Sequence, residues 1–289
     1  MIRVRRWRPN RSRSPDRRWP GAIAALVAVL SMGAAPVPPV SRLSSEPPAV
    51  DAAAVVLADA STGRILYAHN AHRRLPPAST TKMMTAILAV EALPLDALVR
   101  ISARAAVERS GAAIGLEAGD RWKVDDLLHA MLMHSANDAA VALAEAVSGS
   151  VEAFVARMNE RARVLGARDT HFVTPNGRYH PDHLSSAYDL ARIARAALAH
   201  PTVARIVALR TWQLTRPGAA PRMLINTNRL LWQVRGADGV KTGWIAESGR
   251  CVVGSATRGG RRLIVVLLNA PRMFTDAGRL LEYGFAGTR

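Results

Sequence analysis

The spacing of apolar residues changes three times along the chain, and these changes predict the fold class. Residues 52–70 contain two short apolar runs around the turn STGR, which is typical of a β-hairpin. Helical spacing dominates residues 79–200, and strand-like runs return in residues 236–270. A last helical segment covers residues 275–285. We therefore expect an α+β fold, in which one antiparallel sheet is built from both chain ends and a helical subdomain is inserted into it.

Turn residues and stop signals divide these regions into elements. Pro94 ends the first predicted helix and Gly166 the fourth, because proline and glycine interrupt helical backbone. The central helices are expected at residues 79–93, 124–133, 137–149, 151–166 and 185–200, and the strands near the C-terminus at residues 236–244, 249–259 and 260–270.

The N-terminal segment resembles an export signal and not a part of the fold. Residues 1–35 begin with a polybasic stretch and continue with about 15 apolar residues that end in small ones. A membrane-spanning helix needs about 20 apolar residues, so we expect a signal peptide cleaved after Ala34 or Ala35, with an uncleaved anchor as the alternative. Residues 36–50 are rich in proline and serine and predict a linker. One domain is then expected at residues 51–289, in the periplasm or cell-wall space.

Charge and cysteine content narrow the class of protein. The formal charge is +17, to which the eight arginines and one aspartate of residues 1–35 contribute +7. The other arginines are scattered, without a basic stripe that alternates with aromatic residues, so no nucleic-acid partner is expected.

Cys251, the single cysteine, lies in an apolar run and is expected to be a buried structural thiol. His180 and His183 flank a proline and lack a third ligand, so no metal or cofactor is expected.

Lysine is rare in this chain, and one lysine lies where chemistry requires an amine. Three of the 39 basic residues are lysine, and Lys82 follows Ser79 by three positions in a predicted helix. Residues three apart share a helix face, so the amine lies beside the hydroxyl. A neutral lysine can remove the proton of a serine, whereas arginine stays protonated. The pair alone also fits an ordinary helix N-terminus.

Two further short segments carry polar groups suited to a cleft. Ser135 and Asn137 lie in HSAND, between two predicted helices, although Asn137 also fits the N-cap of the second helix. Lys241, Thr242 and Gly243 lie in a predicted strand. Lysine and threonine provide a charge and a hydroxyl for a carboxylate, and glycine lets a peptide approach and pair with the strand edge.

In this order, the three segments resemble the serine, S-x-N and K-T-G motifs of penicillin-binding proteins and serine β-lactamases. The flanking segments PASTTKMMT, GDRWKVDDLLHAMLMHSANDAAVALAE and DGVKTGWIAESGRCVVGSA are similar to the D-alanyl-D-alanine carboxypeptidase family of low-molecular-mass penicillin-binding proteins. The resemblance covers about residues 53–285. It implies a β-lactamase/penicillin-binding-protein-like fold, with residues 51–289 as a single serine D,D-peptidase catalytic domain.

The resemblance also implies roles for the motif positions. Ser79 is expected to be the nucleophile, acylated by the penultimate D-alanine of a peptidoglycan stem peptide, with Lys82 as its base and Ser135 as the proton relay to the leaving group. The expected substrate-binding residues are Asn137, Lys241, Thr242, Gly243 and Trp244. The lysine–threonine pair would face the substrate carboxylate, and the backbone N–H groups of Ser79 and Trp244 would hold the oxyanion.

Some positions depart from the family pattern or leave a choice open. Arg178 lies in TPNGR, where the family usually has leucine, and its role is open. Arg272 and Arg279 are both candidates for assisting carboxylate binding. The sequence ends at Arg289, so the β-rich domain and amphipathic C-terminal helix of many relatives are not expected, and membrane contact is expected only through an uncleaved N-terminal segment.

The expected function is therefore a D-Ala-D-Ala carboxypeptidase inhibited by β-lactam antibiotics, with alternatives that use the same residues. A D,D-endopeptidase that cleaves peptide cross-links has the same site. A class A β-lactamase needs a deacylating glutamate in E-x-x-L-N, and no glutamate here is followed by that pattern. A non-catalytic wall-binding module would have a degenerate site, whereas every motif position is intact.

Overall fold

The computed structural model describes residues 46–215 and 220–287, which contain one large antiparallel sheet and a helical region. The strands are β1 (Ala54–Asp59), β2 (Ile65–His69), β3 (Leu98–Arg100), β4 (Arg121–Lys123), β5 (Thr211–Leu214), β6 (Arg222–Ile225), β7 (Ala237–Ile245), β8 (Gly249–Arg258) and β9 (Arg261–Leu268). The helices are the 3₁₀ turn η1 (Ala78–Thr81), α1 (Lys82–Ala92), α2 (Ala103–Val107), α3 (Val124–Met133), α4 (Asn137–Ser148), α5 (Val151–Val164), α6 (Ala187–Ala199), α7 (Pro201–Ala208), α8 (Leu230–Gln233) and α9 (Met273–Ala286). The expected signal peptide and most of the expected linker lie outside the described residues.

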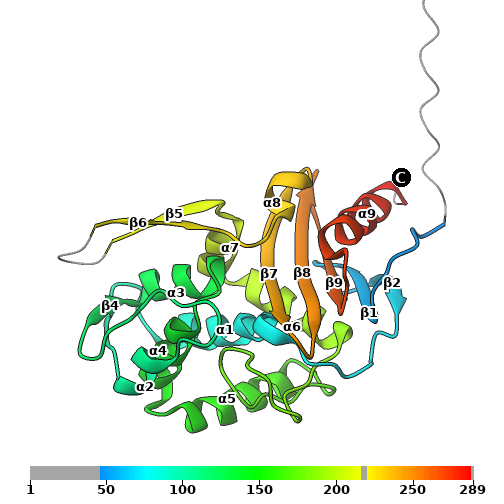
Figure 1. Cartoon of the computed structure of the whole chain (residues 1–289). Helices are drawn as coiled ribbons and strands as arrows, with labels where there is room; N and C mark the ends of the chain where they lie inside the picture. The colour runs from blue at the N-terminus through cyan, green and yellow to red at the C-terminus, as the bar shows by residue number, and fades with distance from the viewer. Residues whose placement is uncertain (1–45, 216–219, 288–289) are drawn as a thin grey trace, which may run out of the picture. The chain divides into compact units, whose positions relative to one another are not determined.

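The large sheet has the strand order β2-β1-β9-β8-β7 (Figure 1). Strand β1 pairs with β9, from Ala54 opposite Leu268 to Asp59 opposite Leu263, so the two ends of the domain meet in the middle of the sheet. The β1–β2 hairpin and the three C-terminal strands follow the predicted pattern. The prediction of one antiparallel sheet built from both chain ends is confirmed.

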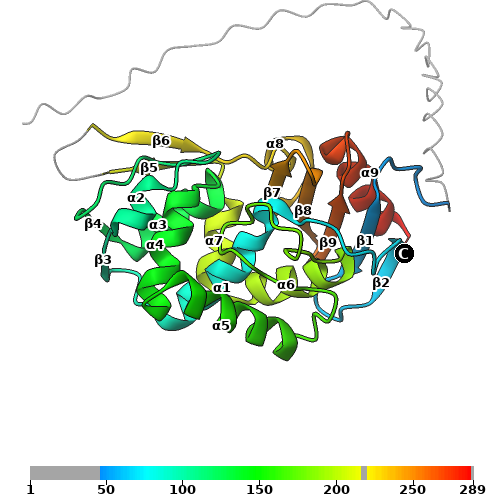
Figure 2. The ribbon, with the colours of Figure 1, turned by 60° about the horizontal axis from the view of Figure 1, so that its bottom comes forward.

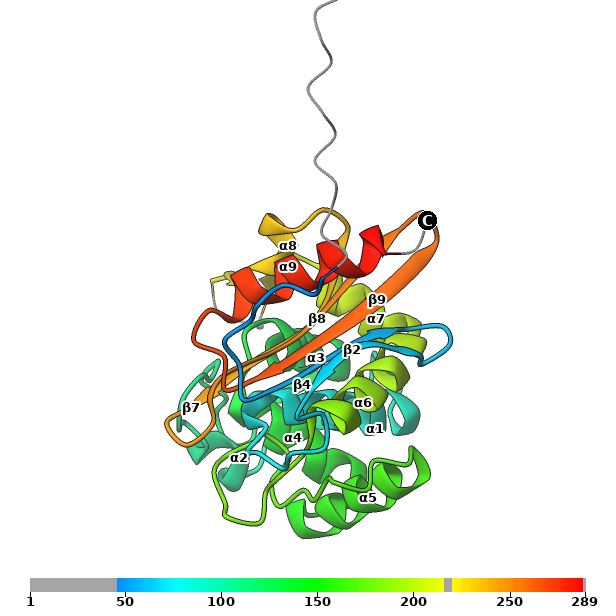
Figure 3. The same ribbon diagram turned by 90° about the vertical axis from the view of Figure 1, so that its right-hand side faces the viewer.

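Alternate residues of each central strand face two separate hydrophobic layers. In β1, Val55 and Leu57 pack in the layer that contains α8 and α9, whereas Val56 packs in the layer of the helical region. Strand β9 alternates in the same way, with Val265 and Val266 in different layers. Figure 3 shows α9 along one face of the sheet and α6 on the other. Burial of both faces explains why these strands appear in the sequence as nearly continuous apolar runs.

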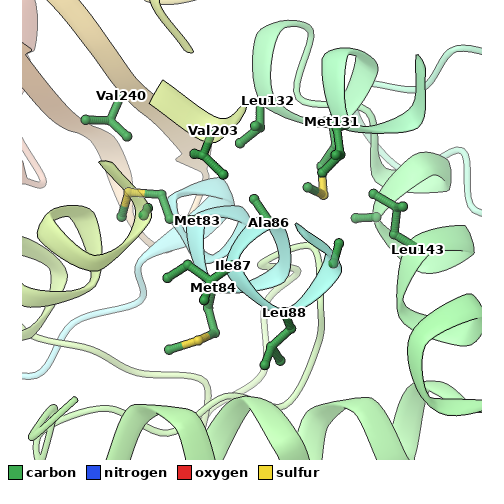
Figure 4. Packing of buried hydrophobic residues seen from close by; sticks show 14 of the residues in the cluster. Met83, Met84, Ala86, Ile87, Leu88, Met131, Leu132, Leu143, Val203 and Val240 are labelled. Carbon is green, nitrogen blue, oxygen red and sulfur yellow. The ribbon is translucent and has the colours of Figure 1, made fainter. Parts of the chain in front are cut away.

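Helix α1 forms the centre of the helical region. Its residues from Lys82 to Ala89 are all buried, as expected for a helix that is covered on every side. Met131 of α3, Leu143 of α4 and Val203 of α7 pack around it, and Val240 of β7 joins it to the sheet (Figure 4). The N-terminus of α1 is thereby held against the edge strand β7.

Some short elements were not predicted from the sequence. They include the hairpins β3–β4 and β5–β6, whose strands of three or four residues are too short for a periodic pattern. Figures 1 and 2 show the β5–β6 hairpin beside α3. Within residues 46–215 and 220–287, no single helix has the length and hydropathy of a membrane span; α4 and α5 reach them only together, across a bend of 84°.

Candidate active site

A cleft of about 990 Å³ lies along the edge strand β7, where it faces the helical region. Among the predicted site residues, those that line the cleft are Ser79, Ser135, Asn137, Thr242, Gly243 and Trp244. The remaining two, Lys82 and Lys241, are buried next to it. The structure therefore brings all of the predicted site residues together from three distant segments of the chain.

Ser79 lies in a tightly held turn at the start of α1. The preceding residue, Ala78, has a φ of +48°, a left-handed conformation that is costly for a residue with a Cβ atom. Two glycines pack closely against this turn, one on each side. A Cβ atom on Gly177 would lie 1.9 Å from the Ala78 carbonyl oxygen, and one on Gly243 would lie 3.0 Å from the Ser79 nitrogen. Close backbone contact on both sides thus fixes the position of the serine.

Lys82 is buried and its amine contacts three oxygen atoms. The Nζ atom lies 2.8 Å from Ser79 Oγ, 2.6 Å from Asn137 Oδ1 and 2.7 Å from the backbone oxygen of Asn176. Burial lowers the pKa of Lys82 well below its usual value, and the charge of Lys241 lowers this pKa further. A neutral amine has two N–H groups, and the two asparagine oxygens accept them. The lone pair is then left for the hydroxyl of Ser79.

Ser135 lies in the turn between α3 and α4, and Asn137 is the first residue of α4. Ser135 has a φ of +65°, a strained conformation outside glycine, and lies on the wall of the cleft. The interpretation of Asn137 as an N-cap is wrong, because Ala136 holds that position and α4 has no side-chain cap. The Asn137 side chain instead donates to the Ser110 carbonyl oxygen and accepts from Lys82.

Asp138 and Asn176 support the site and were not predicted. The buried Asp138 carboxylate accepts three successive backbone N–H groups, from residues 114–116, at 2.9–3.1 Å. It thereby fixes the loop that brings Ser110 to the cleft. Asn176 accepts from Lys82 through its backbone oxygen, so the residue type at this position could not predict the contact. Asp138 could have been predicted as a site residue, because it directly follows the S-x-N motif.

The strand side of the cleft is formed by β7. Lys241 is buried, and its Nζ atom donates to the Thr242 carbonyl oxygen at 3.0 Å. Burial lowers the pKa of Lys241 to about 7, so its charge is partly lost at neutral pH. The Thr242 hydroxyl lies 2.8 Å from the Thr227 hydroxyl. Trp244 is 66% exposed at the rim of the cleft, which leaves its ring available to a ligand.

The arginines of the cleft differ from the two candidates that the sequence suggested. Arg272 and Arg279 both lie near the buried carboxylate of Asp276, at 3.8 and 3.9 Å, and neither lines the cleft. Both face this carboxylate because they lie one turn from it on or beside α9. Met273 and Phe274, at the start of this helix, do line the cleft. The arginines that line the cleft are Arg178, Arg229 and Arg250.

Cys251 and His183 lie outside the chemistry of the cleft. Cys251 is buried, and burial raises the pKa of its thiol, as expected for a structural residue. His183 lies 2.8 Å from the Thr81 hydroxyl through Nε2, and its Nδ1 accepts from the Val173 N–H group at 3.0 Å. Both ring nitrogens are thus used within the protein. Across the described residues, no group of three His, Cys, Asp or Glu side chains is placed to hold a metal ion.

These contacts are suited to acyl transfer. The serine hydroxyl faces a buried amine of lowered pKa, a combination that makes serine nucleophilic. Strand β7 is at the edge of the sheet, where an extended peptide can lie beside it, and Gly243 leaves room for such a peptide. Fold and site together have the arrangement of serine–lysine proteins of the penicillin-binding type.

Comparison with known proteins identifies the family. The family model described as D-alanyl-D-alanine carboxypeptidase matches residues 41–272, and the chain belongs to this family. The curated relative D-alanyl-D-alanine carboxypeptidase DacF of Bacillus subtilis is 39% identical over 244 residues, which cover 82% of this chain and 62% of DacF. The D-alanyl-D-alanine carboxypeptidase of Streptomyces sp. K15 is 34% identical over 281 residues, which cover 91% of this chain and 95% of that protein. The chain therefore spans less than two thirds of DacF and almost all of the Streptomyces protein.

Solved structures of relatives have the same fold. A serine-to-alanine mutant of the Streptomyces K15 DD-transpeptidase superimposes with a TM-score of 0.78 at 32% identity, over 83% of this chain and 99% of that one. The D-alanyl-D-alanine carboxypeptidase of Mycobacterium tuberculosis H37Rv gives a TM-score of 0.79 at 32% identity, over 86% and 96% of the two chains. The predicted penicillin-binding-protein-like fold is confirmed.

Proposed function

We propose that this chain is a serine-type D-Ala-D-Ala carboxypeptidase, which removes the terminal D-alanine from peptidoglycan stem peptides through an acyl-enzyme on Ser79. The observation that carries the proposal is the contact of the buried Lys82 amine with Ser79 Oγ and with two asparagine oxygens. Family membership supports the substrate class, because DacF and the Streptomyces protein are named for this activity.

Acylation begins when neutral Lys82 takes the proton of the Ser79 hydroxyl. The Oγ atom then bonds to the carbonyl carbon of the penultimate D-alanine, and the backbone N–H groups of Ser79 and Trp244 hold the oxyanion. The proton passes through Ser135 to the leaving nitrogen, and the terminal D-alanine departs. Water hydrolyses the resulting ester, and the serine recovers its proton.

The strand side of the cleft orients the substrate. The peptide pairs with the edge of β7, and its terminal carboxylate lies toward Thr242 and Lys241. Asn137 binds the substrate amide, although its oxygen is already shared with Lys82, so its Nδ2 group is the donor that can turn from Ser110 toward a ligand. The same contacts accept a β-lactam, whose carboxylate takes the place of the substrate carboxylate.

We also propose that the protein is exported. The basic and apolar stretches of residues 1–35 support cleavage after Ala34 or Ala35, which leaves residues 51–289 as the catalytic domain behind a linker. N-terminal sequencing of the exported protein checks this: a chain that starts at Met1 would identify an anchor instead.

Product analysis tests the activity. The purified protein is incubated with uncross-linked pentapeptide muropeptides and with cross-linked dimers. Release of free D-alanine without cleavage of the dimers supports the carboxypeptidase. Cleavage of the dimers identifies an endopeptidase, and transfer of the acyl group to an added amine identifies a transpeptidase, the activity named for the K15 structure. In parallel, intact-mass analysis with penicillin should give an adduct on the wild type and none on Ser79→Ala; an adduct on that variant sinks the assignment of Ser79.

A further inference from the structure

The cleft carries more positive charge than its terminal carboxylate site requires. Arg178, Arg229 and Arg250 line it, and no described aspartate or glutamate does. Arg178 is paired with Glu108 at 3.2 Å, but among the described residues no carboxylate lies within ion-pair distance of Arg229 or Arg250. Both of these side chains belong to exposed residues. An anionic ligand therefore meets two guanidinium groups that lack a carboxylate partner within the part of the chain that the structure describes.

The position of Ser79 divides the cleft into a leaving-group side and an acyl side. Gly243 lies directly beside the serine, with its Cβ position 3.0 Å from the Ser79 nitrogen, so the reacting carbonyl lies at this point of β7. The terminal carboxylate lies toward Thr242. The rest of the peptide must then follow β7 in the other direction, along Trp244 and residue 245.

The two arginines lie on different sides of this point. Arg229 lies two residues after Thr227, whose hydroxyl contacts Thr242, so its backbone lies on the leaving-group side. Arg250 is the direct cross-strand partner of Trp244 on β8 and belongs to the acyl side. Cross-strand partners project from the same face of a sheet. Arg250 and the exposed ring of Trp244 therefore lie next to each other where the peptide leaves the reacting carbonyl.

One backbone contact holds Arg250 in this position. Its Nη1 atom donates to the Pro271 carbonyl oxygen at 3.2 Å. A guanidinium has five N–H donors, so others remain for a ligand. From Thr242, where the terminal carboxylate lies, to Trp244 the strand advances by about 7 Å, the length of two residues. A peptide paired with β7 covers the same distance in two residues, counted from its terminal D-alanine. The residue that precedes the acylated D-alanine therefore lies at Trp244 and Arg250.

We propose that Arg250 selects substrates with a carboxylate in the residue directly before D-Ala-D-Ala, so that acidic stem peptides are the preferred substrate class. The inference rests on the proposed carboxypeptidase function, because it uses the substrate direction of that reaction. The carboxylate accepts hydrogen bonds from Arg250, and its aliphatic stem packs against Trp244. A neutral or basic residue at the same position lacks the first interaction or repels the guanidinium.

The test uses N-acetyl-X-D-Ala-D-Ala peptides in which X is glutamate, glutamine or lysine. For the wild type, we expect kcat/KM to be about three to five times higher for the glutamate peptide than for the glutamine peptide, the effect of one partly exposed charge pair. Arg250→Gln should bring this ratio close to one, and Arg250→Glu should favour the lysine peptide. Arg229→Gln is the matched control, since it lies where all three peptides are identical and should change their rates by a common factor.

Equal wild-type rates on the three peptides would overturn the selection by Arg250 while leaving the carboxypeptidase assignment in place. The inference is also wrong if Arg250→Glu keeps the wild-type order, or if Arg229→Gln changes the glutamate-to-glutamine ratio as strongly as Arg250→Gln does. Absence of D-alanine release from every peptide would instead contradict the proposed function itself. Covalent labelling of each variant by penicillin shows that its site is folded.

Discussion

The two sides of the cleft each bury a lysine, and they surround it differently. On the helix side, Lys82 contacts three oxygen atoms, of Ser79, Asn137 and Asn176. On the strand side, Lys241 donates to the Thr242 carbonyl oxygen. Burial lowers the pKa of both amines. The difference shows that burial makes a lysine easier to deprotonate, whereas the arrangement of acceptors decides whether its lone pair or its N–H groups face the substrate.

The strongest test of this comparison is Lys82→Arg. Arginine stays protonated and cannot accept the proton of Ser79, so the second-order rate of acylation by penicillin should fall by about 10³-fold or more. The measurement is the rate of adduct formation by mass spectrometry, with the melting temperature as a check on folding. If a folded Lys82→Arg protein is acylated within a few-fold of the wild-type rate, Lys82 is not the base.

Gly177 and Gly243 both pack against the turn that holds Ser79, but the contact at Gly177 is closer. An alanine at Gly177 would place Cβ 1.9 Å from the Ala78 carbonyl oxygen in a residue whose φ is +83°, whereas at Gly243 the nearest contacts are 3.0 Å. We expect Gly177→Ala to reduce stability by about 2–4 kcal/mol and acylation by about 10²-fold, because both strain and overpacking displace the serine. Gly243→Ala should have the smaller effect. Thermal melts and acylation rates check this, and an inverse order would contradict it.

On the strand side, the pKa of about 7 for Lys241 predicts a pH effect on carboxylate binding. Its folded pKa lies below the usual value, so the protonated form that attracts a carboxylate is present below pH about 7 and is lost as the pH rises. The KM for D-Ala-D-Ala peptides should therefore increase above that pH. Rates should decrease at the acidic end, because protonation of Lys82 removes the base.

Lys241→Arg tests whether the charge of Lys241 causes this pH effect on KM. Arginine keeps its charge across this range, so the alkaline rise in KM should disappear. Its larger head must fit a buried space, and we expect kcat/KM near neutral pH to fall by about tenfold, with measurable acylation retained. A pH profile of KM for both proteins is the measurement. An alkaline rise that persists in the variant would show that another group controls carboxylate binding.

The smallest expected effect is that of Thr227→Val. This change removes the hydroxyl that lies 2.8 Å from Thr242 Oγ1 and leaves the volume of the side chain nearly constant. The loss of one hydrogen bond, about 0.5–1.5 kcal/mol, should lower kcat/KM by about two- to tenfold. Acylation by a peptide ester that lacks the terminal carboxylate is the control, and an equal loss on that substrate would place the effect outside carboxylate binding.

The sequence by itself determined the elements and the motif residues. Long apolar runs on β8 and β9 and helical spacing from α3 to α6 predicted the main elements, because burial of these segments requires such patterns. Ser79, Lys82 and the K-T-G segment were predicted because the three motifs together, in this order, resemble those of a known family. The short strands β3 to β6 lacked a pattern of sufficient length, and they were missed.

Only the tertiary structure decided which backbone groups contact the motif residues, which arginines lie at the cleft, and how far the pKa of Lys82 is lowered. Asn176 acts through its backbone oxygen, and the turn at Ala78 is held by Gly177, contacts that join positions almost 100 residues apart. The choice among the arginines also depended on packing, since α9 holds Arg272 near Asp276 and not at the cleft. The lowered pKa of Lys82 arises from burial and from the charge of a lysine on a distant strand. Local residue patterns do not contain these quantities, because desolvation and charge interactions depend on distances that only the folded chain defines.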